Sequence, residues 1–192
     1  MQESVRFLLL YVVMPIWLAA GVADWACHRR AGIADTSGPM ESVLHLFMVG
    51  QVGVGVLAAM FFEINAAVLL LLLLLLVAHT LTTHLDLHYT DGKRHVSAFE
   101  QSVHGYLEAM PMTAYALLAA AYWPQLQAVF GAGKARADWR FVLKNEPLAT
   151  PQLMLLLVAS LLLGAAPFLE ELYRTLKTRR QAGAASRAQG TL

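Results

Sequence analysis

The chain has 192 residues, of which 58% are hydrophobic and only 14% are charged, and its mean hydropathy is positive. Soluble domains usually carry about 25% charged residues, so this composition favours a membrane protein and excludes a disordered chain. The net charge of +1 predicts no general attraction for nucleic acid. The single cysteine, Cys27, cannot form an internal disulfide and leaves the redox compartment open.

Five apolar windows are long enough to cross a bilayer, which requires roughly 20 mainly apolar residues per helix. Polar turns separate them, and Pro39 and Asn65 suit the starts of the second and third helices. The sequence therefore predicts an all-α, polytopic membrane bundle with a four-helix metal-binding core. We expect one domain, 1–173, with spans at about 7–25, 40–62, 66–87, 99–123 and 151–170.

The remaining segments are more polar. Residues 124–150 mix apolar and basic side chains, which is typical of a loop or short helix on the membrane surface. Residues 174–192 are basic and rich in Ala, Gly and Ser, so we expect a disordered tail. The small residues at 19–23 leave open a cleaved signal peptide, although the apolar run before them is long for one.

The distribution of basic residues predicts an orientation. In a five-span arrangement, nine of the 14 Lys and Arg residues fall on the side of the C-terminus and five on the other. Because cytoplasmic loops carry the excess of positive charge, we expect a cytoplasmic C-terminus. The expected location is a bacterial inner membrane.

Acids and histidines recur at a helical spacing. Four of the seven histidines follow an acid by four residues, where chance predicts roughly 0.5. This spacing puts both side chains on one face of a helix. One pair, Asp91 and His95, lies in a polar turn, where solvated residues are expected. The others stand at span ends: Asp24 with His28, Glu41 with His45, and Glu100 with His104.

An up-down arrangement brings these span ends to one membrane face. On the third span, His79 and Asp86 share a helix face. A charged group at membrane depth costs roughly 2.5–3.5 kcal/mol and usually persists because it pairs or functions. We therefore predict a metal site of one or more cations near the cytoplasmic face. Its candidate ligands are Asp24, His28, Glu41, His45, His79, Asp86, Glu100, His104 and Glu108.

Imidazole with carboxylate suits iron, manganese or zinc, whereas copper(I) and iron–sulfur sites need clustered thiolates. In ligand chemistry the chain resembles soluble di-iron carboxylate proteins, which place Glu and Glu-x-x-His ligands on the inward faces of four helices. The resemblance covers 24–108, with a spacing of four in place of three. It implies two transition-metal ions, iron first and manganese or zinc as alternatives, and oxidation of a lipid-soluble substrate by hydroxylation, desaturation or quinol oxidation. The residues that carry it are Glu41 with His45, Glu100 with His104 and Glu108, Asp24 with His28, and His79 with Asp86.

Two other families share part of the pattern. Membrane desaturases use doubled His boxes, and only the spacings of His79, His84 and His88 are similar here. Zinc amidases of the alkaline ceramidase type also combine His and Asp at one membrane end, but have more spans. A zinc-dependent hydrolase of lipid amides or esters is therefore the first alternative. The second, a proton- or metal-coupled transporter, predicts polar residues across the whole bilayer, and the other halves of spans two to four are nearly all apolar.

The expected partners are a membrane lipid or quinone-like substrate and an electron donor, and the oligomeric state stays open. Basic residues near the predicted site could hold a lipid head group. They could equally be the positive anchors of the cytoplasmic face. These residues are Arg29, Arg30, Lys93 and Arg94.

Overall fold

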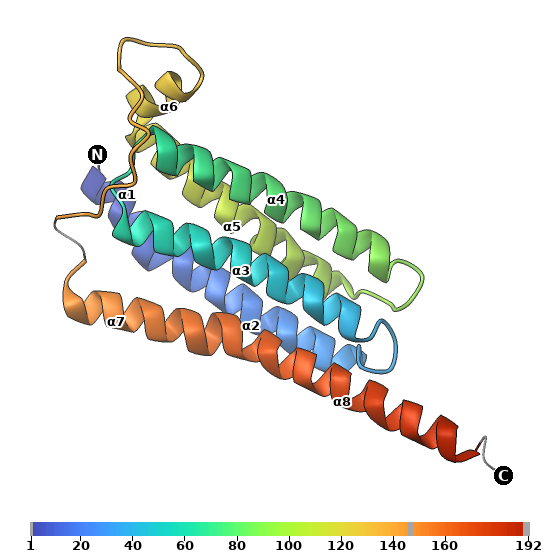
Figure 1. Ribbon diagram of the computed structural model, residues 1–192. Coiled ribbons are helices and arrows are strands. Elements are labelled where there is room, and N and C mark those ends of the chain that lie inside the picture. Colours follow the sequence, from blue (N-terminus) through green and yellow to red (C-terminus); the bar gives the residue numbers. More distant parts are fainter. Residues whose placement is uncertain (1, 146–147, 190–192) are drawn as a thin grey trace.

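The structure is a computed structural model that describes residues 2–145 and 148–189, and these residues form helices without a strand (Figure 1). Three helical segments in line make the first rod, and three more make the last. The first rod consists of α1 (Gln2–Leu8), the π-helix η1 (Leu9–Val13) and α2 (Met14–Ala31). Next come α3 (Pro39–Phe61), α4 (Ala66–Thr90), α5 (Ala98–Ala121) and α6 (Trp123–Val129). The last rod consists of α7 (Thr150–Ala159), the π-helix η2 (Ser160–Ala165) and α8 (Ala166–Gln189).

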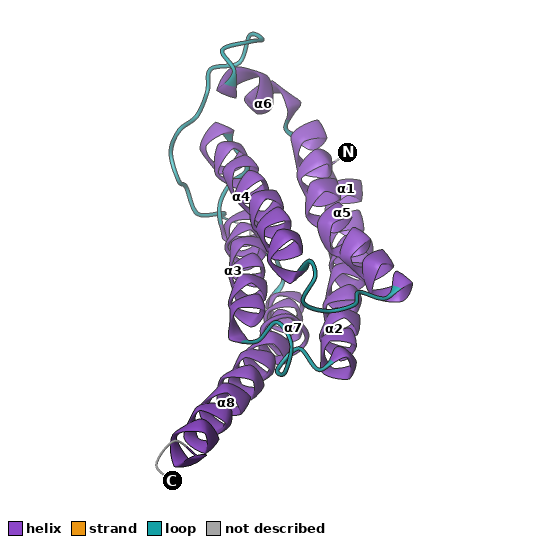
Figure 2. Cartoon of the chain, turned by 90° about the vertical axis from the view of Figure 1, so that its right-hand side faces the viewer, coloured by secondary structure: helices purple, strands orange, loops and turns teal. Residues whose placement is uncertain are grey.

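The helices α2, α3, α4 and α5 run alternately up and down, as predicted (Figure 1). The loops 32–38 and 91–97 therefore lie at the same end of the bundle. Seen along the bundle, α2 packs with α5 on one side and α3 packs with α4 on the other (Figure 2). Helix α8 contacts both α2 and α3, so it joins the two pairs.

The helix boundaries follow from local sequence. Helix α2 ends at Gly32, whose φ of 65° is the left-handed conformation that glycine adopts without a steric penalty. Pro39 starts α3, and the Asn65 side chain accepts a hydrogen bond from the Val68 backbone N–H to cap α4. The Ser97 hydroxyl caps α5 in the same way. Both predicted helix starts, at Pro39 and Asn65, are confirmed.

Four helical rods are long and apolar enough to cross a membrane: Glu3–Ala31, Pro39–Phe61, Ala66–Thr90 and Thr150–Arg187. The all-α membrane bundle is therefore confirmed. The predicted span at 99–123 is also a helix, α5, but it is not among these four. The reason lies in its first half, where three ionisable side chains, Glu100, His104 and Glu108, share one helix face. A transmembrane position for α5 stays a prediction.

The prediction of a disordered tail from residue 174 is wrong, because α8 continues to Gln189. Its end extends past the bundle (Figure 1). Alanine, arginine and glutamine are strong helix formers, and they prolong a helix that α7 and η2 have already nucleated. The segment 124–150 is predicted to lie on the membrane surface. In it, α6 is followed by an extended chain, which forms an isolated antiparallel β-bridge between Leu143 and Phe62. Residues 146–147 and 190–192 lie outside the described residues.

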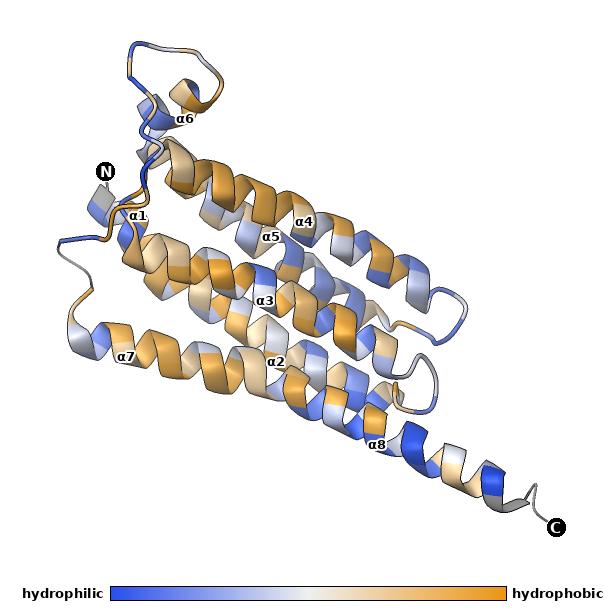
Figure 3. Ribbon diagram, in the orientation of Figure 1, coloured by the Kyte–Doolittle hydropathy of each residue, from blue (hydrophilic) through white to orange (hydrophobic). Residues whose placement is uncertain are grey.

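Polar residues are unevenly distributed along the bundle. They gather where α2 and α4 end and where α3 and α5 begin, whereas the opposite halves of α3 and α4 are mostly apolar (Figure 3). At that opposite end Ile64, Val68, Leu69 and Leu118 form a buried hydrophobic cluster. The bundle therefore has an apolar half that packs and a polar half in which the candidate ligands lie.

Candidate metal centre

The candidate ligands come together in the polar half of the bundle. Side chains at the end of α2, the start of α3, the second half of α4 and the start of α5 converge there, because these helices alternate in direction. Seven of the nine are buried, with no more than 6% of their surface exposed, and His104 and Glu108 are half-buried. The seven are Asp24, His28, Glu41, His45, His79, Asp86 and Glu100.

One group of four side chains joins α2 to α5. A ligand atom from each of Asp24, His28, Glu100 and His104 lies within 4.8 Å of all the others. The Asp24 Oδ1 atom is 2.9 Å from His104 Nε2 and 3.4 Å from His28 Nε2. The His28 Nε2 atom is also 3.4 Å from Glu100 Oε1. These four residues are one candidate cradle for a cation.

A second group reaches from α2 to α3 and shares one residue with the first. It consists of His28, Glu41 and His45, whose ligand atoms also lie within 4.8 Å of one another. The His45 Nε2 atom is 3.4 Å from Asp86 Oδ2 on α4. The structure thus offers two adjoining clusters of ligand atoms, with His28 common to both.

A carboxylate that the sequence analysis missed holds both of these histidines. Glu171 on α8 is fully buried, and its two oxygens each lie 2.9 Å from an imidazole Nδ1 atom, Oε2 from His28 and Oε1 from His45. An ionised carboxylate only accepts hydrogen bonds, so both Nδ1 atoms donate to it. The two Nε2 atoms are thereby directed away from Glu171, toward Asp24, Glu100 and Asp86. This arrangement is how metal-ligating histidines are commonly oriented in proteins.

The spacing around the two Nε2 atoms leaves room for a cation. Charge-assisted N–H···O bonds are about 2.7–2.9 Å long, but His28 Nε2 is 3.4 Å from its carboxylate neighbours and makes no hydrogen bond. Two ligand atoms each about 2.1 Å from a tetrahedral metal ion are about 3.4 Å apart. The same separation recurs between His45 and Asp86. The residues present therefore fit a metal ion.

The charges in the cluster are unbalanced. Among the described residues of this site, Arg94 supplies the buried guanidinium. Its Nη2 atom lies 2.7 Å from Glu41 Oε1, and its Nη1 atom lies 2.6 Å from Glu100 Oε1. Burial alone would lower its pKa, but Glu41 and Glu100 raise the pKa above its ordinary value and keep the guanidinium charged. Glu41 also accepts a hydrogen bond from the Ser37 hydroxyl. This one guanidinium thus faces five buried carboxylates: Asp24, Glu41, Asp86, Glu100 and Glu171.

Three candidate ligands, His79, Asp86 and Glu108, belong to neither cluster, and Asp86 contacts the second cluster through His45. His79 and Glu108 line a cavity of about 60 Å³ that also contacts Asp24, His45, Asp86 and His104. Most of the rest of its wall is apolar and includes Trp17, Leu18 and Phe168. The structure therefore places His79 and Glu108 next to the candidate centre, with room between for a small molecule.

The three histidines that are not candidate ligands lie outside the site. His84, His88 and His95 are exposed, and the His84 ring bonds the Thr80 carbonyl of its own helix. Asp91, the predicted loop partner of His95, is exposed as well. The structure therefore places these residues apart from the candidate ligands.

The basic residues considered for a lipid head group do not act as one unit. Arg94 is committed to Glu41 and Glu100, so it is not free to bind a phosphate. Arg29 lies 3.3 Å from Glu170 and stacks on Trp25, and the Lys93 ammonium lies over the Tyr89 ring. Arg30 is exposed. A head-group role for Arg29, Arg30 and Lys93 stays a prediction.

The position of Glu171 could have been predicted from the number of spans. An odd number of spans returns the end of the fifth one to the face where the candidate ligands lie, so Glu170 and Glu171 had to arrive at the same depth. The fifth predicted span ends at residue 170, and Glu171 is not among the predicted ligands. Comparison of the chain with protein-family models, with curated proteins and with solved structures found no match.

Proposed function

We propose that this protein is a membrane metalloenzyme whose His and carboxylate cluster holds two transition-metal ions, iron first, and which oxidises a lipid-soluble substrate. The observation that carries the proposal is the pair His28 and His45, both held through Nδ1 by Glu171. Each therefore directs its Nε2 atom toward a buried carboxylate 3.4 Å away, Asp24 for His28 and Asp86 for His45.

The arrangement supports two ions over one. The two ligand groups share His28. Glu171 contacts the Nδ1 atoms of both His28 and His45, so both Nε2 atoms point away from Glu171. Two-metal sites hold their ions about 3.5–4 Å apart. With the imidazoles neutral, as metal ligands must be, the five buried carboxylates and Arg94 leave four negative charges, which two divalent cations would balance.

The chain's own residues define how such a centre would work. A pair of iron ions, when bound, would supply activation of O2 or peroxide. Glu171 keeps the imidazoles aligned, and Arg94 holds Glu41 and Glu100 in place while balancing part of their charge. The apolar walls of the adjoining cavity exclude water from the side where a substrate would approach. A cytoplasmic site in a bacterial inner membrane, with an electron donor there, completes the proposal.

The test is oxygen uptake by the protein in detergent after anaerobic loading with Fe(II), with a benzoquinol as reductant. We expect uptake that requires both iron and the quinol and that His28→Ala abolishes, since His28 belongs to both ligand groups. A protein that retains one zinc ion through purification and shows no uptake would overturn the proposal. Cleavage of lipid esters or amides by that zinc form would favour the hydrolase alternative.

A further inference from the structure

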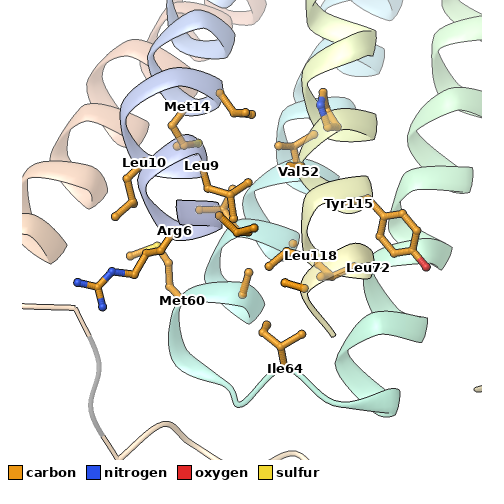
Figure 4. Close-up of a pocket in the computed structure, with 18 of the residues that line it drawn as sticks. Arg6, Leu9, Leu10, Met14, Val52, Met60, Ile64, Leu72, Tyr115 and Leu118 are labelled. Atoms are coloured by element: carbon orange, nitrogen blue, oxygen red, sulfur yellow. The ribbon is translucent and has the colours of Figure 1, made fainter. Parts of the chain in front are cut away.

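The apolar half of the bundle contains a second, larger cavity. It has a volume of about 660 Å³ and lies among α1, η1, α3, α4 and α5. Figure 4 shows the side chains of Leu9, Leu72 and Leu118 in its wall, with the Arg6 side chain at the edge pointing away from them. Cavities of about 300–1,000 Å³ with apolar walls and a few polar groups are typical ligand sites.

Two buried side chains bring unpaired polar atoms to this cavity. Gln51 is 7% exposed and His79 is 6% exposed, and both line the cavity. The Thr82 hydroxyl donates to the Ala78 carbonyl at 2.8 Å, so it must accept the 3.1 Å hydrogen bond from Gln51 Nε2. That bond fixes the amide and leaves Gln51 Oε1 as an acceptor without a partner. The His79 Nδ1 atom has no partner either.

His79 connects the two cavities. It lines the 660 Å³ cavity and also the 60 Å³ cavity that contacts the candidate ligands Asp24 and His45. A molecule with its polar end at Gln51 and His79 would therefore stand next to the metal centre. Its apolar body would extend toward Leu9, Leu72 and Leu118.

The far end of the large cavity does not favour a charged head group. Two acids and two bases line it there, Glu3 and Glu63 with Arg6 and Lys144. The Lys144 ammonium donates to the Ala59 carbonyl at 2.7 Å, and burial lowers its pKa. The two acids balance the two bases, and Lys144 is already hydrogen-bonded. This end of the cavity therefore offers no selective attraction for an anion.

We propose that the large cavity binds a benzoquinol that carries a hydrocarbon tail, with a quinol hydroxyl donating to Gln51 Oε1 beside His79. The identification of this quinol as the substrate rests on the proposed function, whereas its binding does not. An unpaired buried acceptor prefers a molecule with a hydroxyl and disfavours the quinone, which has only acceptors to offer.

The experiment is an anaerobic calorimetric titration of the metal-free, full-length protein in detergent with a decyl-substituted benzoquinol and with the matching quinone. We expect the quinol to bind at least about tenfold more tightly than the quinone, and Gln51→Leu to remove this preference. Because no metal is present, this outcome is independent of whether the centre binds iron. Equal affinities of quinol and quinone for the unmodified protein would overturn the proposal.

Matched variants on two helices test the location. Val52→Phe on α3 and Ala114→Phe on α5 fill the cavity and should each weaken quinol binding at least about tenfold. Two residues further on, Val54 and Ala116 are exposed and outside the cavity, so Val54→Phe and Ala116→Phe should bind as the unmodified protein does. If the outward variants lose as much binding as the inward ones, the quinol does not occupy this cavity.

Discussion

The imidazole rings of His28 and His45 stack on each other, with centroids 4.5 Å apart and planes 8° from parallel. They come from different helices, α2 and α3, and Glu171 on α8 bonds both of them. The stacked rings direct their Nε2 atoms toward buried carboxylates on α2, α4 and α5. A third helix, α8, thus holds the candidate ligands that the other two supply.

Replacing Glu171 should weaken the metal centre without removing a ligand. In Glu171→Gln the side-chain amide can no longer accept from both imidazoles, and loss of such an orienting carboxylate typically costs 10–100-fold in metal affinity. Metal retained after dialysis against graded chelator concentrations measures the change. The control is Glu170→Gln, because Glu170 bonds Trp25 and Arg29 outside the cluster. A similar loss in both variants would contradict an orienting role for Glu171.

Removal of a histidine should distinguish ligands from bystanders. We expect His45→Ala and His104→Ala to lose bound metal, since each supplies a nitrogen to the clustered ligand atoms. His88→Ala and His95→Ala should keep it, because both side chains are exposed. Elemental analysis of the purified variants is the measurement. Full metal occupancy in both His45→Ala and His104→Ala would refute the proposed ligand set.

Arg94 should be important for stability. Its guanidinium pairs with buried Glu41 and Glu100, and removing one partner of a buried ion pair typically costs 3–5 kcal/mol. We therefore expect Arg94→Met to lower the unfolding free energy in detergent by about that amount. The exposed Arg30 provides the comparison, and Arg30→Met should change stability by no more than about 0.5 kcal/mol. Equal stability of the two variants would show that Arg94 is not essential to the cluster.

The cap of α4 offers a test of the fold away from the metal centre. Asn65 accepts from the Val68 backbone N–H and donates to the Arg140 carbonyl, so it caps a helix and anchors the segment after α6. Asn65→Ala should lower stability by about 1–2 kcal/mol in thermal unfolding while metal content stays unchanged. A loss of metal in this variant would mean that the two halves of the bundle are coupled more tightly than their contacts indicate.

Most of the candidate site could be predicted from helical periodicity. The spacing of four placed Asp24 with His28 and Glu100 with His104 on single faces, and the alternating direction of the helices then brought those faces together. These inferences depend only on geometry within a helix and on the order of helices. The clustering of distant side chains was therefore predictable as a group.

Pairings between side chains could not be read from the sequence. Nothing local distinguishes Glu171 from Glu170, yet one is fully buried and the other half-buried, because helix rotation against α2 and α3 decides which side faces inward. Arg94 looked like a surface anchor in a polar turn, and only the fold of that loop brings it between Glu41 and Glu100. Both depend on tertiary packing.

Metal stoichiometry tests the central claim most directly. The purified protein and its His28→Ala variant should be compared by elemental analysis after extensive dialysis, because His28 is common to both ligand groups. We expect about two equivalents of a transition metal, iron first, in the unmodified protein and a loss of at least one in the variant. Fewer than about 0.3 equivalents in the unmodified protein, even after incubation with Fe(II), would contradict the account.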